Sequence, residues 1–254
     1  MKKLIVANWK MNKTVAEAVS TADELKKLAG KEKNVDLVIC PAFTALYAVA
    51  KELIGSNIKL GAQNMHFESA GAYTGDISPL MLKDIGCEYA ILGHSERREF
   101  FKEDDSLINK KILSALKHSI KPILCVGETW NQRENNQTKS ILGNQLEKGL
   151  NGVSSAQVKN ITIAYEPVWA ISRGNPNQKA ATPEDAEAAH DFIRNVLEKM
   201  FDKKISTNSR ILYGGSMKPE NAKELLSRKD IDGGLVGNAS LNAKNFYAII
   251  KAAK

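Results

Sequence analysis

The side chains in this chain that could do acid–base chemistry are a carboxylate, an imidazole and an ammonium group, each placed just after a short apolar run. Glu166 follows such a run, where partial desolvation is expected to raise the pKa of its carboxyl group and its strength as a base. His94 precedes a short predicted helix whose N-terminus disfavours an imidazolium, so we expect a neutral ring that donates a hydrogen bond. Lys10 carries a compact cation that suits a phosphate or a developing oxyanion. A base, a hydrogen-bond donor and a cation are the groups needed to remove a proton from a carbon next to a carbonyl.

Paired glycines and two long loops are the next candidates for function. The segments 213–216 and 233–238 place Gly-Gly pairs after the last two apolar runs. Glycine lets backbone N–H groups approach a ligand closely, so the two turns together predict a phosphate site, although either pair alone could be a tight turn. Residues 170–181 are rich in Gly, Ser, Asn and Pro, as expected of a mobile lid, and the loop 63–76 is long enough to be functional or to reach a partner. By contrast, residues 130–139 are expected to be the solvated start of a helix.

A repeating pattern of short β-branched runs, turns and amphipathic helices must position these groups. Eight runs share the 254 residues, which gives about 32 residues per repeat, the length of one βα unit. Near-continuous apolar runs indicate parallel strands covered on both faces. An open doubly wound sheet loses support because no G-x-G-x-x-G follows the first run, and eight units are the number that closes a barrel. We therefore predict an α/β fold, a single (β/α)8 barrel with eight parallel strands surrounded by helices, as one catalytic domain over residues 1–254. The runs are 4–8, 35–39, 58–61, 89–92, 122–126, 161–165, 210–213 and 231–236.

Composition and charge exclude several classes of protein. Hydrophobic residues make up 43% of the chain and charged residues 26%, which is ordinary for a globular protein, and no run is long enough to span a bilayer. The 36 basic and 29 acidic residues leave a net charge of +7, which favours anionic ligands. The basic residues are scattered and only 6% of residues are aromatic, unlike a nucleic-acid reader. Three cysteines without C-x-x-C spacing indicate buried free thiols. We expect a cytoplasmic protein that binds neither nucleic acid nor membrane.

Six motifs, in register along the whole chain, resemble those of the triosephosphate isomerase family. They are NWKMN at 8–12, GAYTG at 71–75, GHSERR at 93–98, CVGET at 125–129, AYEPVW at 164–169 and YGGS at 213–216. The resemblance implies a TIM-barrel isomerase of glycolysis and gluconeogenesis. Such an enzyme interconverts dihydroxyacetone phosphate and D-glyceraldehyde 3-phosphate through an enediol(ate), without a metal or an organic cofactor.

The resemblance also implies a role for each group at the site. Glu166 would be the base, neutral His94 would polarise the carbonyl, and Lys10 would act with Asn8 at the oxygen side. The residues implied to lie behind these groups are Glu96, which would hold Lys10, together with Ser95 and Cys125. The backbone groups implied to hold the phosphate belong to Ser172, Ser216, Gly237 and Asn238.

Two positions depart from the family pattern. The lid usually reads Ala-Ile-Gly-Thr-Gly-Lys, whereas here residues 175–178 form an insertion before Lys179. Asn238 stands where the family usually has glycine, and we expect the turn to survive because Asn tolerates left-handed backbone geometry. Both departures concern the grip on phosphate and the closure of the lid rather than the chemistry.

The resemblance further implies a homodimer held by the loop 63–77, which would enter the neighbouring subunit. Thr74 at the loop tip would there meet Asn8, Lys10 and Glu96, and Tyr73 would be a further dimer contact. The loop has little to pack against on its own barrel, and a two-fold dimer would supply two reciprocal pockets.

Two alternatives remain open from the residues. Another phosphate-binding barrel enzyme, such as a lyase or a different sugar-phosphate isomerase, would share the glycine turns but would not need Lys10, His94 and Glu166 at three strand ends. A catalytically silent binding protein should have lost at least one of the three.

Overall fold

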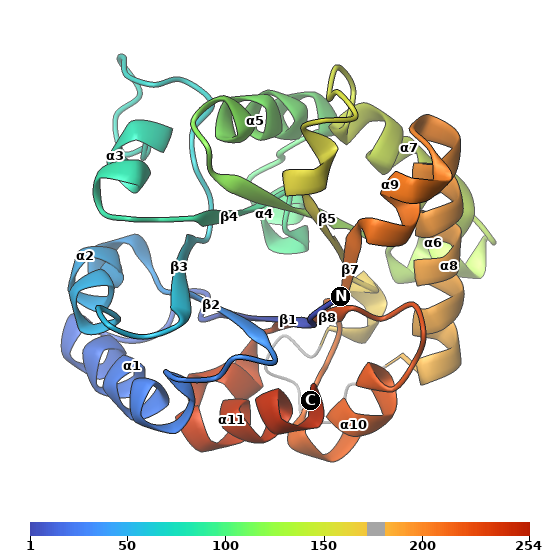
Figure 1. Cartoon of the computed structure of the whole chain (residues 1–254). Helices are drawn as coiled ribbons and strands as arrows, with labels where there is room; N and C mark the ends of the chain where they lie inside the picture. The colour runs from blue at the N-terminus through green and yellow to red at the C-terminus, as the bar shows by residue number, and fades with distance from the viewer. Residues whose placement is uncertain (172–180) are drawn as a thin grey trace.

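A computed structural model of the chain, which describes residues 1–171 and 181–254, confirms the predicted fold: eight parallel strands close into a barrel (Figure 1). Every neighbouring pair runs parallel, and β1 closes the barrel by pairing with both β2 and β8. The strands are β1 (Leu4–Asn8), β2 (Asp36–Cys40), β3 (Ile58–Ala62), β4 (Tyr89–Leu92), β5 (Lys121–Val126), β6 (Thr162–Tyr165), β7 (Arg210–Tyr213) and β8 (Gly233–Val236).

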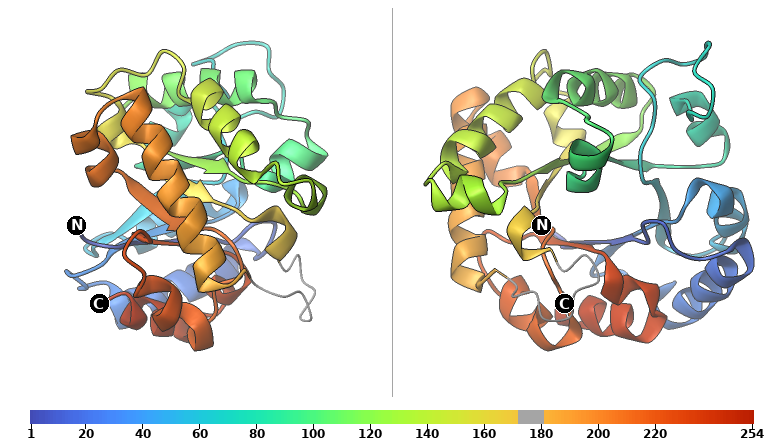
Figure 2. Two further views of the ribbon diagram at one scale, coloured as in Figure 1. Left: turned by 90° about the vertical axis from the view of Figure 1, so that its right-hand side faces the viewer. Right: turned by 180° about the vertical axis from the view of Figure 1, so that it is seen from behind.

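Helices form an outer layer around the strands, as both views in Figure 2 show. The α-helices are α1 (Val15–Ala29), α2 (Phe43–Glu52), α3 (Pro79–Asp84), α4 (Ser95–Phe100), α5 (Asp105–Lys117), α6 (Trp130–Glu134), α7 (Thr138–Gly149), α8 (Pro183–Met200), α9 (Lys203–Asn208), α10 (Pro219–Leu226) and α11 (Ala243–Ala252). Short 3-10 helices are η1 (Val158–Asn160), η2 (Val168–Ala170) and η3 (Asn238–Leu241).

Alternate residues of each strand face the barrel interior and the surrounding helices. In β1, Leu4 and Val6 pack with the inner residues of other strands, whereas Ile5 and Ala7 pack in the larger core beneath the helices. All four side chains are fully buried. A strand covered on both faces needs apolar residues at every position, which explains why the runs do not alternate with polar residues.

The two chain termini lie at the same end of the barrel, the end at which the strands begin (Figures 1 and 2). Lys254 forms an ion pair there with Glu32, with 2.6 Å between Lys254 Nζ and Glu32 Oε2. The opposite end, formed by the carboxyl ends of the strands and the loops after them, is where a site is expected in this architecture. Within the described ranges, we find no helix with both the length and the apolar character needed to cross a membrane.

His190 of α8 is a buried histidine away from the strand ends. It is fully buried, its Nδ1 lies 3.0 Å from the carbonyl oxygen of Asp230, and its Nε2 has no hydrogen-bond partner in the described part of the chain. Burial lowers the pKa of His190 from 6.5 to about 4.

This histidine predicts a specific loss of stability in acid. The folded-state pKa of His190 lies below its unfolded value, so folding favours the neutral ring. The contribution of His190 to the free energy of unfolding is therefore fully present above pH 6.5 and falls by about 3 kcal/mol as the pH decreases toward 4. His190→Asn keeps a donor for Asp230 but cannot titrate, so its free energy of unfolding should fall less with acid than that of the wild type. Urea unfolding at fixed protein concentration between pH 7 and pH 4 measures the difference. Parallel pH dependence in the two proteins would contradict the assignment.

Candidate active site

Lys10 is aimed into the barrel mouth by an uncommon backbone conformation just after β1. Its φ angle is 51°, in the left-handed region that residues other than glycine seldom adopt. The Lys10 N–H donates to Asn8 Oδ1 at 3.1 Å, and Gln63 Nε2 donates to the Lys10 carbonyl at 2.9 Å. The Lys10 Nζ lies 2.7 Å from Glu96 Oε1. The turn and the ion pair together fix the position of the ammonium group.

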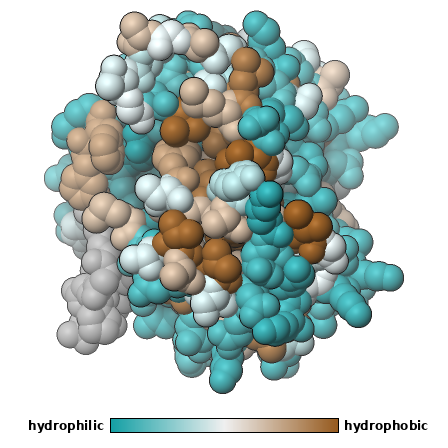
Figure 3. Space-filling view, turned by 90° about the vertical axis from the view of Figure 1, so that its left-hand side faces the viewer, coloured by the Kyte–Doolittle hydropathy of each residue, from teal (hydrophilic) through white to brown (hydrophobic). Residues whose placement is uncertain are grey.

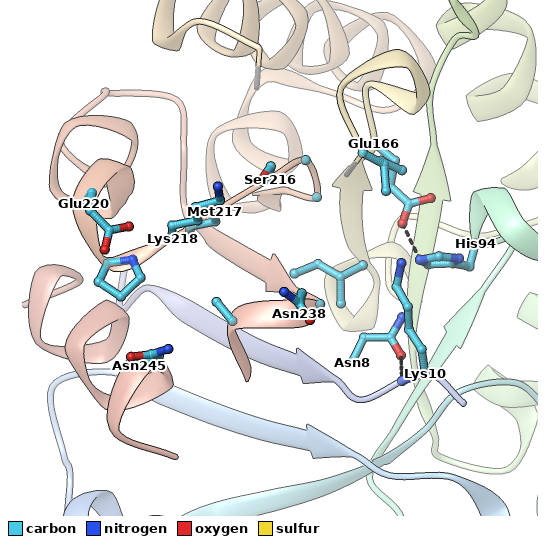
Figure 4. A pocket seen from close by; sticks show the side chains of 17 residues that line it. Asn8, Lys10, His94, Glu166, Ser216, Met217, Lys218, Glu220, Asn238 and Asn245 are labelled. Carbon is cyan, nitrogen blue, oxygen red and sulfur yellow. Dashed lines mark hydrogen bonds and ion pairs between the residues drawn. The ribbon is translucent and has the colours of Figure 1, made fainter. Parts of the chain in front are cut away.

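His94 stands at the N-terminus of α4, where a left-handed Gly93 (φ 72°) ends β4 and turns the chain. The His94 Nδ1 accepts a hydrogen bond from the Glu96 N–H at 3.3 Å. A nitrogen that accepts from a backbone N–H is unprotonated, so this geometry assigns a neutral ring with its proton on Nε2. That nitrogen points toward Glu166 (Figure 4).

Glu166 follows β6 and is 2% exposed. Its Oε2 accepts a hydrogen bond from the Ser95 N–H at 2.8 Å. Its Oε1 lies 2.9 Å from His94 Nε2, a close contact that lacks the alignment of a full hydrogen bond. The base candidate and the electrophile candidate therefore touch each other in this structure.

The pKa of Glu166 is lowered from its ordinary value, and our expectation of a raised pKa was wrong. Burial is the largest influence and by itself raises the pKa, but His94, the Ser95 N–H and Lys10 lower it and together outweigh burial. The expectation considered desolvation alone, because the residues around position 166 in the sequence do not show which groups face the carboxylate. The group is therefore ionised at neutral pH and already able to accept a proton.

Glycine at position 214 leaves room for the base. A Cβ there would lie 2.8 Å from Glu166 Cγ, closer than real contacts allow. On the other side of the mouth, a Cβ at Gly237 would lie 3.3 Å from Lys10 Cε. Both glycines stand at the carboxyl ends of their strands, as the phosphate-turn prediction requires.

The second predicted glycine pair, Gly233-Gly234, does not contribute to that turn, and this part of the prediction was wrong. The pair begins β8 instead of following it, so it lies a strand's length from the barrel mouth. A Cβ at Gly233 would lie 1.9 Å from the Leu4 carbonyl oxygen, so glycine is required there for close packing of β8 against β1. Gly237 and Asn238, which follow β8, line the cavity at the mouth.

A cavity of about 260 Å³ brings the predicted residues together (Figure 4). Lys10, His94 and Glu166 form one wall, and the backbone turns after β7 and β8 lie opposite. The predicted residues that line it are Asn8, Lys10, His94, Glu166, Ser216, Gly237 and Asn238. The predicted Ser172, the insertion 175–178 and Lys179 lie outside the described residues.

The remaining predicted residues lie behind the cavity or away from it. The Cys125 thiol is fully buried, and its pKa is raised well above the usual range by burial and, less strongly, by the Glu166 carboxylate beside it. Tyr73 and Thr74 are exposed and lie outside the cavity of their own chain. Across residues 1–171 and 181–254 no cluster of three or more His, Cys, Asp or Glu side chains could hold a metal ion.

The far end of the cavity was not predicted from the sequence. Lys218, Glu220 and Asn245 line it, from the first residues of α10 and α11 (Figure 4). No local pattern marks these residues, because the two helix starts meet only when β7 and β8 lie side by side.

The Ser95 N–H offers a test of what holds the pKa of Glu166 low. Ser95 is the first residue of α4, where proline is tolerated, and His94 already has the extended conformation that proline requires of its predecessor (φ −51°, ψ 141°). Ser95→Pro removes the donated N–H, so the pKa of Glu166 should rise. Carbon-13 NMR titration of labelled glutamate measures it. Ser95→Ala keeps the N–H and should leave the pKa unchanged; equal shifts in both variants would contradict this account.

Comparisons with known proteins identify the family of the chain. The sequence model of the triosephosphate isomerase family matches residues 3–253. The chain is 53% identical over 250 residues to a triosephosphate isomerase of Carboxydothermus hydrogenoformans, covering 98% of each chain, and 53% identical over 253 residues to that of Fusobacterium nucleatum, covering 99% of each. The crystal structure of triosephosphate isomerase from Bartonella henselae is similar, with a TM-score of 0.89, 38% identity and 99% coverage of both chains. The motifs, the barrel and the grouping of side chains at its mouth thus agree with these relatives, and the chain belongs to the triosephosphate isomerase family.

Proposed function

We propose that this chain is a triosephosphate isomerase in which Glu166, His94 and Lys10 interconvert dihydroxyacetone phosphate and D-glyceraldehyde 3-phosphate. The observation that carries the proposal is the meeting of these three side chains at one wall of a single cavity, with glycine turns opposite. The whole-chain family match does not favour another phosphate-binding barrel enzyme, and the presence of all three groups argues against a silent binding protein.

The proposed chemistry needs only side chains of this protein. Glu166 takes a proton from the carbon next to the carbonyl, and the neutral His94 donates its Nε2–H to the carbonyl oxygen. Lys10, held by Glu96, stabilises the negative charge that develops on that oxygen. His94 passes its Nε2 proton to that oxygen and takes a proton in exchange from the neighbouring hydroxyl, and Glu166 returns the carbon-bound proton to the neighbouring carbon, so the protons balance.

The turns after β7 and β8 are proposed to hold the phosphate. Ser216, Gly237 and Asn238 line the side of the cavity opposite Glu166, with Ser172 as a further proposed contact outside the described residues. The expected need for left-handed tolerance at position 238 does not arise, because Asn238 is not among the residues of positive φ. Asparagine can therefore replace the usual glycine there without backbone strain.

Shortening the base tests its assignment. Glu166→Asp retracts the carboxylate by one methylene, and a displacement near 1 Å costs on the order of a hundredfold in rate when reacting atoms must be in near-attack geometry. We expect kcat to fall by about that factor in a coupled assay with glyceraldehyde 3-phosphate, with a much smaller change in KM. Glu147→Asp, at an exposed position of α7, is the matched control and should retain wild-type kcat. Near wild-type turnover in Glu166→Asp would exclude Glu166 as the base.

We also propose a homodimer in which the loop 63–77 inserts into the partner. The loop projects from the barrel between β3 and α3 (Figure 1). The loop packs on itself: the centroid of the Tyr73 ring lies 4.1 Å from that of the His66 ring, which stacks on Phe67 with 4.4 Å between centroids. Tyr73 nevertheless remains 43% exposed. A preordered loop with an exposed aromatic side chain loses little conformational entropy when it docks.

The surface near this loop supplies a place for it. Helices α2 and α3 lie on the side of the molecule that faces the viewer in Figure 3, where apolar residues gather. The exposed apolar side chains of these two helices are Phe43, Tyr47, Leu80 and Met81. A second cavity, of about 450 Å³, borders Lys10 and Glu96 on the outer side of the site. Docking of the partner's loop in this cavity would place it against Lys10 and Glu96, as the resemblance implies.

Charged substitutions in the loop test the dimer. Tyr73→Asp with Thr74→Arg should give folded monomers with severely reduced activity, because burying these charges at the interface is costly. Thr207→Glu, an exposed change on α9 across the barrel, should leave the dimer intact. Analytical ultracentrifugation reads the assembly and the coupled assay reads the activity. A monomer with full specific activity would refute the proposal.

The proposed isomerase function also implies a domain organisation, a cellular location and a set of partners. We propose that residues 1–254 act as one catalytic domain, that the enzyme works in the cytoplasm, and that its partners are the triose phosphate and a second copy of itself rather than nucleic acid or membrane. The three cysteines are buried and unpaired, which suits a reducing compartment.

A further inference from the structure

Glu128 is a fully buried carboxylate that contacts the chain on both sides of Glu166. It follows β5 and has no exposed surface. The Tyr165 hydroxyl lies 3.1 Å from both carboxylate oxygens, and Trp169 Nε1 donates to Oε1 at 2.9 Å. The Val168 N–H donates to the Glu128 carbonyl oxygen at 3.1 Å. Glu128 therefore holds the residue before the base and two residues shortly after it.

A carboxylate without water around it needs a positive neighbour to remain ionised. Within the described part of the chain, Glu128 forms an ion pair with Arg133 of α6, and 3.6 Å separates Arg133 Nη1 from Glu128 Oε1. The same guanidinium lies over the Trp169 ring, 4.3 Å from its centroid. Arg133 thus contacts both the acceptor and one of its donors.

Asp185 anchors Arg133 from the other side. The Arg133 Nη2 lies 2.6 Å from Asp185 Oδ1. Asp185 is itself fixed by the capping box of α8, in which the Thr182 N–H donates to Asp185 Oδ2 at 3.2 Å. Because Asp185 is held, the guanidinium is kept against Glu128 and Trp169 and does not turn toward solvent. The prediction that residues 130–139 are only a solvated helix start therefore misses a contact with the site.

We propose that Arg133 is a positioning residue for the base Glu166, acting by holding the buried Glu128 carboxylate and the Trp169 ring in place; the proposal rests on the proposed isomerase function. The Glu128 carboxylate accepts hydrogen bonds from both Tyr165 and Trp169 and so fixes the backbone from which the Glu166 side chain extends. Without the guanidinium, the buried carboxylate has no compensating charge beside it, and any rearrangement that brings water to it weakens the two hydrogen bonds. The base then lies in a range of positions around the near-attack geometry, and proton transfer slows.

The test compares Arg133→Gln, Arg133→Lys and the control Arg228→Gln with the wild type. Arg228 also pairs with acids of α8, Glu184 and Glu187, but it does not touch Glu128 or Trp169. We expect Arg133→Gln to lower kcat at least tenfold with KM within threefold, and to raise the primary isotope effect with substrate deuterated at the transferred position. Arg133→Lys, which keeps the charge, should recover most of kcat, and Arg228→Gln should match the wild type.

A second set of variants tests the route through Glu128. In a Glu128→Gln background the carboxylate charge is absent, so adding Arg133→Gln should lower kcat by less than threefold further. Multiplicative losses in the double variant would overturn the route. Wild-type kcat and isotope effect in Arg133→Gln, or equal losses in Arg133→Lys and Arg133→Gln, would overturn the proposal. An inactive wild type in the same assay would refute the isomerase function instead, so the two failures are distinguishable.

Discussion

An ionised carboxylate with almost no contact with water is the feature on which the rest of this site depends. Glu166 is 2% exposed, and burial alone would favour its neutral form, which cannot act as a base. The Ser95 N–H, the His94 ring and the Lys10 ammonium offset that cost. These donors must be placed before a substrate arrives, so much of the folding at the barrel mouth serves to hold them around one side chain.

Barrel closure is what makes this placement possible. Parallel strands carry their carboxyl ends to one rim, so residues far apart in the chain meet without long loops. Lys10 leaves β1, and its Nζ lies 2.7 Å from Glu96, which follows β4. Close approach at the rim then demands small residues, and glycine at position 214 leaves space that a Cβ would take from the Glu166 side chain. The geometry of the base is thus decided by backbone clearance as well as by hydrogen bonds.

Buried acids paired with cations recur where the loops join the outer helices. Glu103 is 5% exposed, and its Oε1 lies 2.6 Å from both Arg97 Nε and Lys111 Nζ. Because Arg97 belongs to α4 and Lys111 to α5, the two ion pairs connect these helices. On the far side, Arg194 of α8 pairs with Asp232 before β8 at 2.5 Å. The Glu128–Arg133 pair has the same design beside Glu166. Such pairs add little net stability, but breaking one leaves a buried charge, so each constrains the loop that carries it.

The sequence by itself determined the strand count, the closed parallel barrel and the three chemical groups at its rim. Periodicity and residue type are local properties, so they can be recognised in the sequence alone. The sequence did not predict features that depend on contacts between residues far apart in the chain. The lowered pKa of Glu166 depends on donors from other strands. Gly233 proved to be a packing residue against β1. Arg133, in a polar stretch with no motif, reaches Glu128 and Trp169 only through the fold. Tertiary structure decided these features because electrostatic and steric effects depend on distance in space, and sequence separation does not record that distance.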